Sequence, residues 1–203
     1  MTRIVAGTAG GRALRVPRTG TRPTSERVRE ALFSRLEHAG AVDGARVLDL
    51  FAGSGALGLE AASRGARSVV LVEVARAAAE LCRRNAREVG LAAVTEVVPA
   101  KVATYLAGEP GEPFDLVLLD PPYDLAPEEV AAALDRLAQG WLAPGATVVL
   151  EAARRAPATT WPEPLEDDGE RRYGDTTLRF ASVPLDAGAP TVKDMPVPPG
   201  GPR

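Results

Sequence analysis

Residues 47–58 have the sequence VLDLFAGSGALG, and this stretch decides the fold. Its first five residues form a short apolar run typical of a buried parallel strand, and a helical pattern follows at 59–62. Gly53, Gly55 and Gly58 have the spacing G-x-G-x-x-G at this junction, where glycine permits a tight turn and close approach of a ligand to the backbone. The stretch therefore predicts the first strand, loop and helix of a doubly wound α/β sheet.

An acidic residue ends the next expected strand. Residues 69–72 are apolar, and Glu73 follows them twenty positions after Gly53. An acid at this spacing is placed to bind both ribose hydroxyls of an adenosine cofactor. NAD and S-adenosylmethionine both suit such a site, and the plain alternative is a tight turn with a solvated strand end. The form Phe51-Ala52-Gly53, and Asp49 before the loop as a partner for a methionine ammonium, favour S-adenosylmethionine.

The motif Asp120-Pro121-Pro122-Tyr123 follows a second apolar run, residues 114–119. Two prolines directly after a strand end its hydrogen-bonding ladder, because neither has an N–H group. The resulting turn presents a carboxylate, a carbonyl and an aromatic ring to a planar amine-bearing base. A proline turn that only caps the sheet is the alternative. In a doubly wound sheet this strand lies beside the first, so both motifs face one crevice.

Composition limits the classes of protein. At 203 residues we expect one globular domain, and no run of eighteen apolar residues predicts a membrane helix. The start of the chain is polar and arginine-bearing rather than typical of a signal peptide. Cys82 is the only cysteine and His38 the only histidine. We interpret them as a packing residue and a surface or capping residue, and we expect no metal site, disulfide or Ser-His mechanism.

The net charge of −3 conceals an asymmetry. Residues 1–37 hold eight arginines against three glutamates, a balance of +5, so the remainder carries −8. A basic segment on an acidic body predicts a polyanion partner for that segment, and arginine suits bidentate phosphate contact. The alternative is a solvated charged surface. The residues expected to contact RNA are Arg3, Arg12, Arg15, Arg22 and Arg27.

Strand and helix patterns alternate from residue 46 to residue 151, which predicts a parallel sheet with right-handed crossovers. The expected strands lie near 46–50, 68–73, 94–98, 114–120 and 145–151, and the expected helices near 56–64, 75–89, 101–107 and 127–139. Before them we expect a β-hairpin, with strands at 4–7 and 13–16, and a helix capped by Thr24 or Ser25. After them a hairpin at 170–181 turns at Gly174-Asp175, and residues 184–203 are predicted to be a disordered tail.

Taken together, residues 3–183 resemble the RsmD family of bacterial 16S ribosomal RNA guanine-N2 methyltransferases. The resemblance rests on Arg3–Gly7, Gly11-Arg12, Arg22–Thr24, Arg27–Phe33, Leu48–Gly55, Asp120–Tyr123 and Tyr173–Thr176. It implies a Rossmann-like class I fold with seven strands, the last antiparallel, and S-adenosylmethionine as the methyl donor. The implied organisation is a basic RNA-binding hairpin and helix at 1–37, a methyltransferase domain at 38–183 and a tail at 184–203.

The resemblance also implies the roles of individual residues. Asp120, Pro121, Pro122 and Tyr123 would hold the target amine and its base, and the cofactor would contact Asp49, Phe51, Gly53, Ser54, Gly55, Glu73 and Ala100. Pro99-Ala100-Lys101 stands where a polar residue often contacts adenine in such enzymes, so we expect backbone contact there.

The expected partner is 16S ribosomal RNA, in the small subunit or an assembly intermediate, and the expected protein is a cytoplasmic monomer. Two alternatives stay open. A DNA adenine or cytosine amino-methyltransferase shares Asp120–Tyr123, but usually carries a target-recognition insert that is not visible between residues 151 and 170. The other is a non-catalytic RNA-binding assembly factor, which has no need of Asp49, Glu73 and Asp120 together. A nicotinamide oxidoreductase is a more distant alternative.

Overall fold

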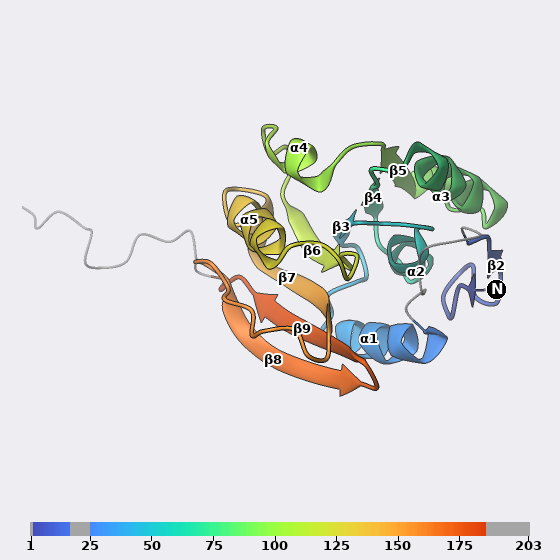
Figure 1. Cartoon of the computed structure of the whole chain (residues 1–203). Helices are drawn as coiled ribbons and strands as arrows, with labels where there is room; N and C mark the ends of the chain where they lie inside the picture. The colour runs from blue at the N-terminus through green and yellow to red at the C-terminus, as the bar shows by residue number, and fades with distance from the viewer. Residues whose placement is uncertain (1, 17–24, 186–203) are drawn as a thin grey trace, which may run out of the picture.

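The computed structural model describes residues 2–16 and 25–185, which form a central sheet with helices on both faces (Figure 1). The seven-stranded sheet has the order β5-β4-β3-β6-β7-β9-β8. Its strands are β3 (Arg46–Leu50), β4 (Ser68–Val72), β5 (Thr95–Val98), β6 (Phe114–Leu119), β7 (Leu142–Ala153), β8 (Glu166–Tyr173) and β9 (Thr176–Ser182). Strands β3 to β7 are parallel, whereas β9 is antiparallel to both neighbours. The seven-stranded α/β sheet with an antiparallel terminal strand is therefore confirmed.

The helices divide between two core clusters. Apolar side chains of α1 (Glu26–His38), α2 (Ala56–Ser63) and α3 (Arg76–Glu88) pack on one face of the sheet. Those of α4 (Val102–Leu106) and α5 (Pro127–Leu137) pack on the other, and a short 3-10 turn, η1 (Ala92–Val94), precedes β5. Because the inner parallel strands β3, β4 and β6 are covered on both faces, their sequences are almost continuously apolar, whereas β5 at the edge is only partly buried.

Most predicted boundaries agree with the structure to within a few residues. Strand β7 begins earlier than expected, because Leu142 pairs with Phe114 before the register shifts. Strand β8 also begins earlier, at Glu166, whereas the turn between β8 and β9 lies at Gly174 and Asp175 as predicted. Strand β9 lies between β7 and β8, so β8 forms the edge of the sheet.

The N-terminal hairpin is much shorter than predicted. It consists of β1 (Thr2–Arg3) and β2 (Ala13–Leu14), so the strand expected at residues 4–7 is wrong. The backbone N–H groups of Val5 and Ala6 donate instead to the carboxylate of Glu60 in α2, at 2.7 and 3.0 Å. A buried side chain thus takes the donors that a strand partner would have used.

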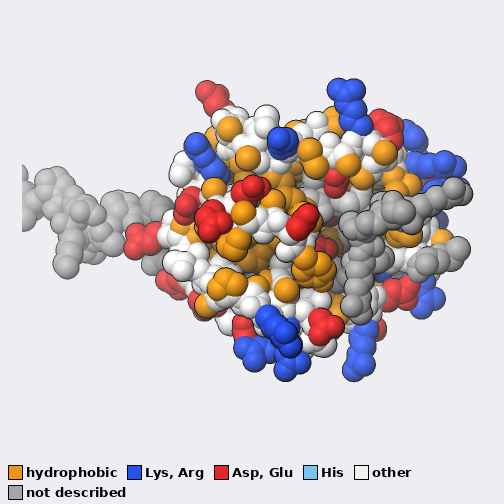
Figure 2. Space-filling view, viewed as in Figure 1, with side chains coloured by type: hydrophobic (Ala, Val, Ile, Leu, Met, Phe, Trp, Pro, Cys, Tyr) orange, Lys and Arg blue, Asp and Glu red, His pale blue; other side chains and the backbone are white. Residues whose placement is uncertain are grey.

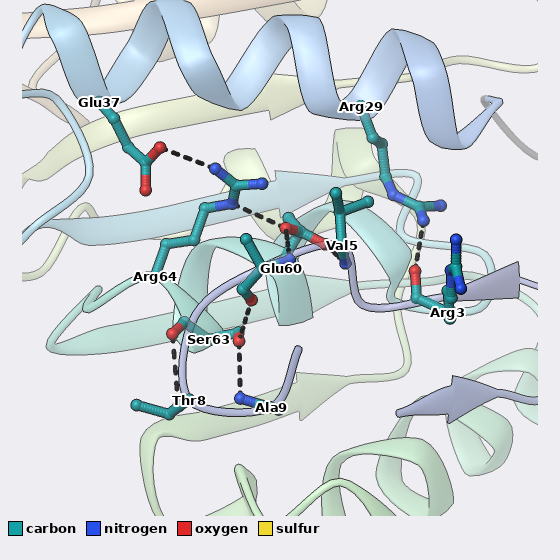
Figure 3. Close-up of polar contacts among 10 residues, drawn as sticks. Arg3, Val5, Thr8, Ala9, Arg29, Glu37, Glu60, Ser63 and Arg64 are labelled. Atoms are coloured by element: carbon teal, nitrogen blue, oxygen red, sulfur yellow. Dashed lines mark hydrogen bonds and ion pairs between the residues drawn. The ribbon is translucent and has the colours of Figure 1, made fainter. Parts of the chain in front are cut away.

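Residues 5–9 are fastened to the end of α2 (Figure 3). Ser63 accepts the Thr8 N–H at its carbonyl and the Ala9 N–H at Oγ, at 2.8 and 2.9 Å. Gly7 has φ +82°, and a Cβ there would lie 1.9 Å from the Ser63 carbonyl oxygen, so the chain approaches α2 as only glycine allows. This segment is therefore packed on the sheet domain rather than held apart from it.

Helix α1 begins as the sequence predicts. Ser25 caps it, its side chain accepting the Val28 N–H; Thr24 lies outside the described residues. Arg29 is wholly buried and donates to Thr2 Oγ1 and to the Arg3 carbonyl, which ties α1 to β1. This arginine of the basic segment therefore has a structural role.

The tail predicted at residues 184–203 lies almost entirely outside the described residues. Within the described ranges no helix is long and apolar enough to cross a membrane.

Candidate active site

The glycine loop after β3 has a backbone that only a few residue types adopt easily. Phe51 has φ +65°, the only positive φ of a non-glycine residue within 2–16 and 25–185. Gly53 and Gly55 follow with φ +57° and +80°. Within α2, a Cβ at Gly58 would lie 2.3 Å from a Leu71 methyl group. The predicted glycine motif therefore forms a tight turn and packs its helix closely on β4.

Glu73 closes this loop from the end of β4. Its Oε2 accepts the backbone N–H of Gly53 at 2.8 Å, and its Oε1 accepts the N–H of Ala75 at 2.7 Å. The side chain is nine-tenths buried. A carboxylate oxygen can accept more than one hydrogen bond, so Glu73 keeps acceptor capacity for ligand hydroxyls while it shapes the loop.

Asp49 lies beneath the loop as a wholly buried carboxyl. Its Oδ2 accepts the Gly58 N–H at 2.8 Å, whereas its Oδ1 has no hydrogen-bond partner in the described part of the chain. Burial raises the pKa of Asp49 to about 8; the Gly58 hydrogen bond lowers it, and the charges of Asp120 and Glu73 raise it further. A buried carboxyl oxygen with one unmet acceptor fits a cationic group, such as the ammonium of a methionine moiety.

The Asp120–Tyr123 motif follows β6 beside the glycine loop. Leu50 pairs with Leu119 in parallel register, so Asp120 leaves its strand next to Phe51. Asp120 is half-buried, whereas Tyr123 is 66% exposed. The structure therefore brings the predicted amine-binding motif and the glycine loop together at the carboxyl edge of β3 and β6.

Four acids share one face of the sheet at this edge. The residue two positions before each acid belongs to the core on the α1–α3 side, and side chains two apart on a strand share a face. The four acids are Glu73, Asp49, Asp120 and Glu151. Sequence reasoning missed Glu151, which is buried at the end of β7 and accepts a hydrogen bond from Thr176 Oγ1 at 3.4 Å. The sequence signal that could have indicated Glu151 is an acidic residue directly after the apolar run of its strand.

Helix α3 holds the glycine loop from the side. Cys82 Sγ donates to the Gly53 carbonyl at 3.2 Å, and Asn85 Nδ2 donates to the Ser54 carbonyl at 2.9 Å. Asn85 also accepts the Arg15 N–H and donates to the Arg15 carbonyl. Cys82 is buried, as the packing interpretation predicted, and burial raises the pKa of its thiol.

Two further residues border the site. Val74, which sequence reasoning did not select, follows Glu73 and is 57% exposed. An apolar side chain left exposed beside a buried acid is suited to contact a planar ligand. Ala100 follows β5 and is half-buried, its N–H donating to the Val98 carbonyl. Its contact with adenine stays a prediction.

The arginines predicted to contact RNA have mixed environments. Arg3 pairs with Glu26, Arg12 donates to the Val89 carbonyl, and Arg15 pairs with Glu88. Arg27 is exposed on α1, and Arg22 lies outside the described residues. Their role in RNA binding stays a prediction.

The chain is similar to known proteins over most of its length. Residues 2–182 match the family model described as conserved hypothetical protein 95. A relative named ribosomal RNA small subunit methyltransferase D, from Escherichia coli strain K12, is 41% identical over 152 residues, 73% of each chain. A hypothetical protein from Thermus thermophilus is 36% identical with a TM-score of 0.78, covering 90% of this chain and 100% of that one. An RNA methyltransferase from Salinibacter ruber, solved with S-adenosyl-L-homocysteine, shares the fold at 23% identity and a TM-score of 0.60, covering 80% and 94%.

Proposed function

Because the chain belongs to the RsmD family, we propose that it methylates the exocyclic N2 of a guanine in 16S ribosomal RNA, with S-adenosylmethionine as the methyl donor. The observation that carries the proposal is the position of Asp120–Tyr123 beside the glycine loop, set by the register of Leu119 against Leu50. An amine-binding turn and a nucleoside-binding loop at one sheet edge provide for both reactants of an amino-methyl transfer.

The residues around the loop fit the cofactor. Asp49 would pair with the methionine ammonium through its unpartnered Oδ1, and Glu73 would accept the ribose hydroxyls. Phe51, Gly53, Ser54 and Gly55 would line the loop side, with Val74 and Ala100 near the adenine. When bound, S-adenosylmethionine supplies the electrophilic methyl group of its sulfonium.

The chain's own residues then prepare the amine. Guanine N2 is a poor nucleophile because its lone pair is delocalised into the ring. Hydrogen bonds from this NH2 to the Asp120 carboxylate and the Pro121 carbonyl favour a more tetrahedral nitrogen with an available lone pair. Asp120 accepts a proton once the nitrogen is methylated, and Pro122 keeps the turn rigid.

Tyr123 would hold the base itself. Enzymes that modify a base extrude it from its stack, and an exposed aromatic ring offers a flat surface for it. The 66% exposure of Tyr123 is consistent with this use, because packing inside the protein does not occupy the ring. No metal or covalent intermediate is needed in this scheme.

The proposed partner is 16S ribosomal RNA in the small subunit or an assembly intermediate, and the proposed location is the cytoplasm, where subunits are assembled. The proposed oligomeric state is a monomer. Two alternatives remain, a DNA amino-methyltransferase and a non-catalytic assembly factor. Between β7 and β8 lies only the connection 154–165, which favours the RNA enzyme over DNA enzymes with large recognition inserts.

Nucleoside analysis after transfer of a labelled methyl group separates these functions. Small subunits or 16S RNA are taken from cells that lack the protein and are incubated with the purified protein and labelled S-adenosylmethionine. They should yield labelled N2-methylguanosine. Labelled N6-methyladenosine or N4-methylcytidine, formed on DNA rather than RNA, would assign the protein to the DNA enzymes. RNA binding without any methyl transfer would instead support an assembly factor.

A further inference from the structure

Four exposed arginines lie near the carboxyl ends of β7 and β8, where the function proposed above gives them no role. They are Arg154, Arg155, Arg171 and Arg172, called here the carboxyl-edge arginines. Because β8 is antiparallel to β9, which is antiparallel to β7, strand β8 runs in the direction of β7. All four arginines therefore lie toward the same sheet edge as Asp120.

Strand register places Arg171 in line with the catalytic motif. Leu119 of β6 pairs with Leu150 of β7, so Asp120 lies level with Glu151. Glu151 pairs with Leu178 of β9, and Leu178 pairs in turn with Arg171 of β8. Directly paired residues point to the same face, so Arg171 shares the face of Asp120. At about 4.8 Å per strand, three strand spacings put their backbones roughly 14 Å apart.

Arg154 and Arg155 come directly after β7. Arg154 lies three residues beyond Glu151, which corresponds to about 10 Å along the strand direction. These distances suit side chains that contact the backbone of an RNA whose base has entered the site. They are too long for contact with the base itself.

The loop that carries Arg154 and Arg155 is anchored. Buried Arg179 donates from Nη1 to the Pro157 carbonyl at 2.6 Å and to Thr159 Oγ1 at 2.7 Å, and from Nη2 to the Ala156 carbonyl at 3.0 Å. The Arg154 N–H also donates to the Asp175 carbonyl at 2.8 Å. The exposed arginines therefore project from a fixed surface, which reduces the entropy lost on binding.

The guanidinium groups of this cluster are largely available to an external anion. Arg154 and Arg155 make no side-chain hydrogen bond or ion pair with any residue that the structure describes, and Arg171 donates only to the adjacent Glu170 carbonyl. Arg172 pairs with Glu170 while its side chain stays 63% exposed, which makes this a weak pair. Among the N-terminal arginines, Arg12 donates to the Val89 carbonyl, whereas Arg3 and Arg15 form exposed pairs with Glu26 and Glu88 that are as weak as the pair of Arg172.

Charge is also polarised along β8. The acids Glu166, Asp167 and Asp168 are at its start, and Arg171 and Arg172 are near its end. Figure 2 shows Lys and Arg side chains gathered over the β8–β9 hairpin, and acidic side chains over the region of α5. The first turn of α5 holds Glu128 and Glu129. The field at this edge therefore attracts a polyanion toward β8 and repels it from α5.

We propose that three of the carboxyl-edge arginines, Arg154, Arg155 and Arg171, bind the phosphate backbone of the RNA beside the target nucleotide; Arg172 follows Arg171 in β8 and so lies on the other face. This rests on the proposed function, because it assumes that RNA is the substrate. Arginine presents a planar fork that matches phosphate oxygens in a bidentate manner, so these residues fix how the RNA crosses the site. The N-terminal arginines are then a second contact of the same RNA.

The test compares two double variants that each remove two positive charges. Arg154→Ala/Arg155→Ala changes the proposed surface, and Arg87→Ala/Arg136→Ala, at exposed positions in the last turns of α3 and α5, is the matched control. Affinity for a 16S RNA transcript is measured from 50 to 200 mM salt. The first variant should bind about tenfold more weakly, with a salt slope flatter by about 0.7 per lost contact, while the control retains the wild-type slope.

Methyl transfer to small subunits separates this inference from the function on which it rests. The first variant should raise the KM for RNA and leave cofactor affinity unchanged, and Arg154→Lys/Arg155→Lys should restore most of the salt slope because it restores the charge. Wild-type protein that transfers no methyl group to RNA would overturn the proposed function. Active protein whose RNA affinity is equally reduced in both double variants, or in neither, would overturn the phosphate-binding surface alone.

Discussion

Glu73 and Gly53, twenty residues apart, are joined by a 2.8 Å hydrogen bond from the Gly53 N–H to Glu73 Oε2. The other oxygen of the same carboxylate accepts the Ala75 N–H at the start of α3. One side chain therefore fixes the loop after β3 and the turn after β4. The contribution proposed for Glu73 to cofactor binding therefore includes the shape of the loop as well as direct contact with the ribose.

Replacing Glu73 by alanine should weaken S-adenosylmethionine binding by about 1–3 kcal/mol, the scale of hydrogen bonds to a charged group. Calorimetric titration measures this, with Glu96→Ala, an exposed acid on neighbouring β5, as the control. A folded Glu73 variant with wild-type affinity would refute the ribose assignment.

Asp49 should make stability depend on pH. Its pKa is about 8 in the folded protein against 3.8 for an ordinary aspartate, so between these values the folded state holds a proton that the unfolded state lacks. The free energy of unfolding should therefore fall as pH rises from about 4 to about 8. Asp49→Asn should flatten this decline in denaturant titrations, and an unchanged decline would show that other groups cause it.

Cofactor binding should release a proton from Asp49. The methionine ammonium favours the ionised carboxylate, so binding near pH 7 shifts Asp49 from the neutral to the charged form. Calorimetry in two buffers with different ionisation enthalpies measures the released proton. The apparent binding enthalpy should differ between the buffers for wild type and not for Asp49→Asn. Equal binding enthalpies in the two buffers for wild type would contradict the pairing of Asp49 with the ammonium.

Glu60→Ala should destabilise the protein by about 3–5 kcal/mol. The wholly buried carboxylate accepts the Val5 and Ala6 N–H groups, which would lose their partner, and pairs with Arg64, which would keep only its ion pair with Glu37. Thermal melting beside Glu80→Ala, which removes an exposed acid, measures the difference. If Glu60→Ala melts like Glu80→Ala, residues 5–9 are not held by this network.

How much of this arrangement the sequence predicts depends on the range of the interactions. The strands around Leu48 and Val117 were predicted closely, because burial on both faces leaves a continuous apolar run. The Val5–Glu60 contact was missed, because nothing local in the sequence marks a side chain that replaces a strand partner fifty-five residues away. For the same reason the sequence predicts the β8–β9 hairpin but not which strand is the edge.

In the candidate site, too, local sequence patterns were informative and long-range contacts were not. The sequence points to Glu73 and Asp120 because each follows an apolar strand at an informative position. Arg29 and Arg154 look alike in the sequence, yet Arg29 is wholly buried and Arg154 is exposed near the candidate active site. Charge counts therefore located a basic segment but could not tell structural arginines from available ones.

Tyr123→Ala should lower kcat/KM for RNA by an amount equivalent to about 1–3 kcal/mol, the value of stacking one base on an aromatic ring. Tyr123→Phe should stay near wild type, because the ring remains. Melting temperatures should not change, since the residue is 66% exposed. Equal losses in both variants would point to the hydroxyl rather than to stacking.

The most direct test of the central claim is nucleoside analysis of 16S RNA from cells that lack the protein and carry either wild type, Asp120→Ala or the exposed control Asp124→Ala. Wild type and Asp124→Ala should restore N2-methylguanosine, whereas Asp120→Ala should not, with its single-turnover rate reduced at least about 100-fold and its cofactor affinity unchanged. Restoration of N2-methylguanosine by Asp120→Ala at the wild-type level would contradict the assignment of Asp120 to the target amine.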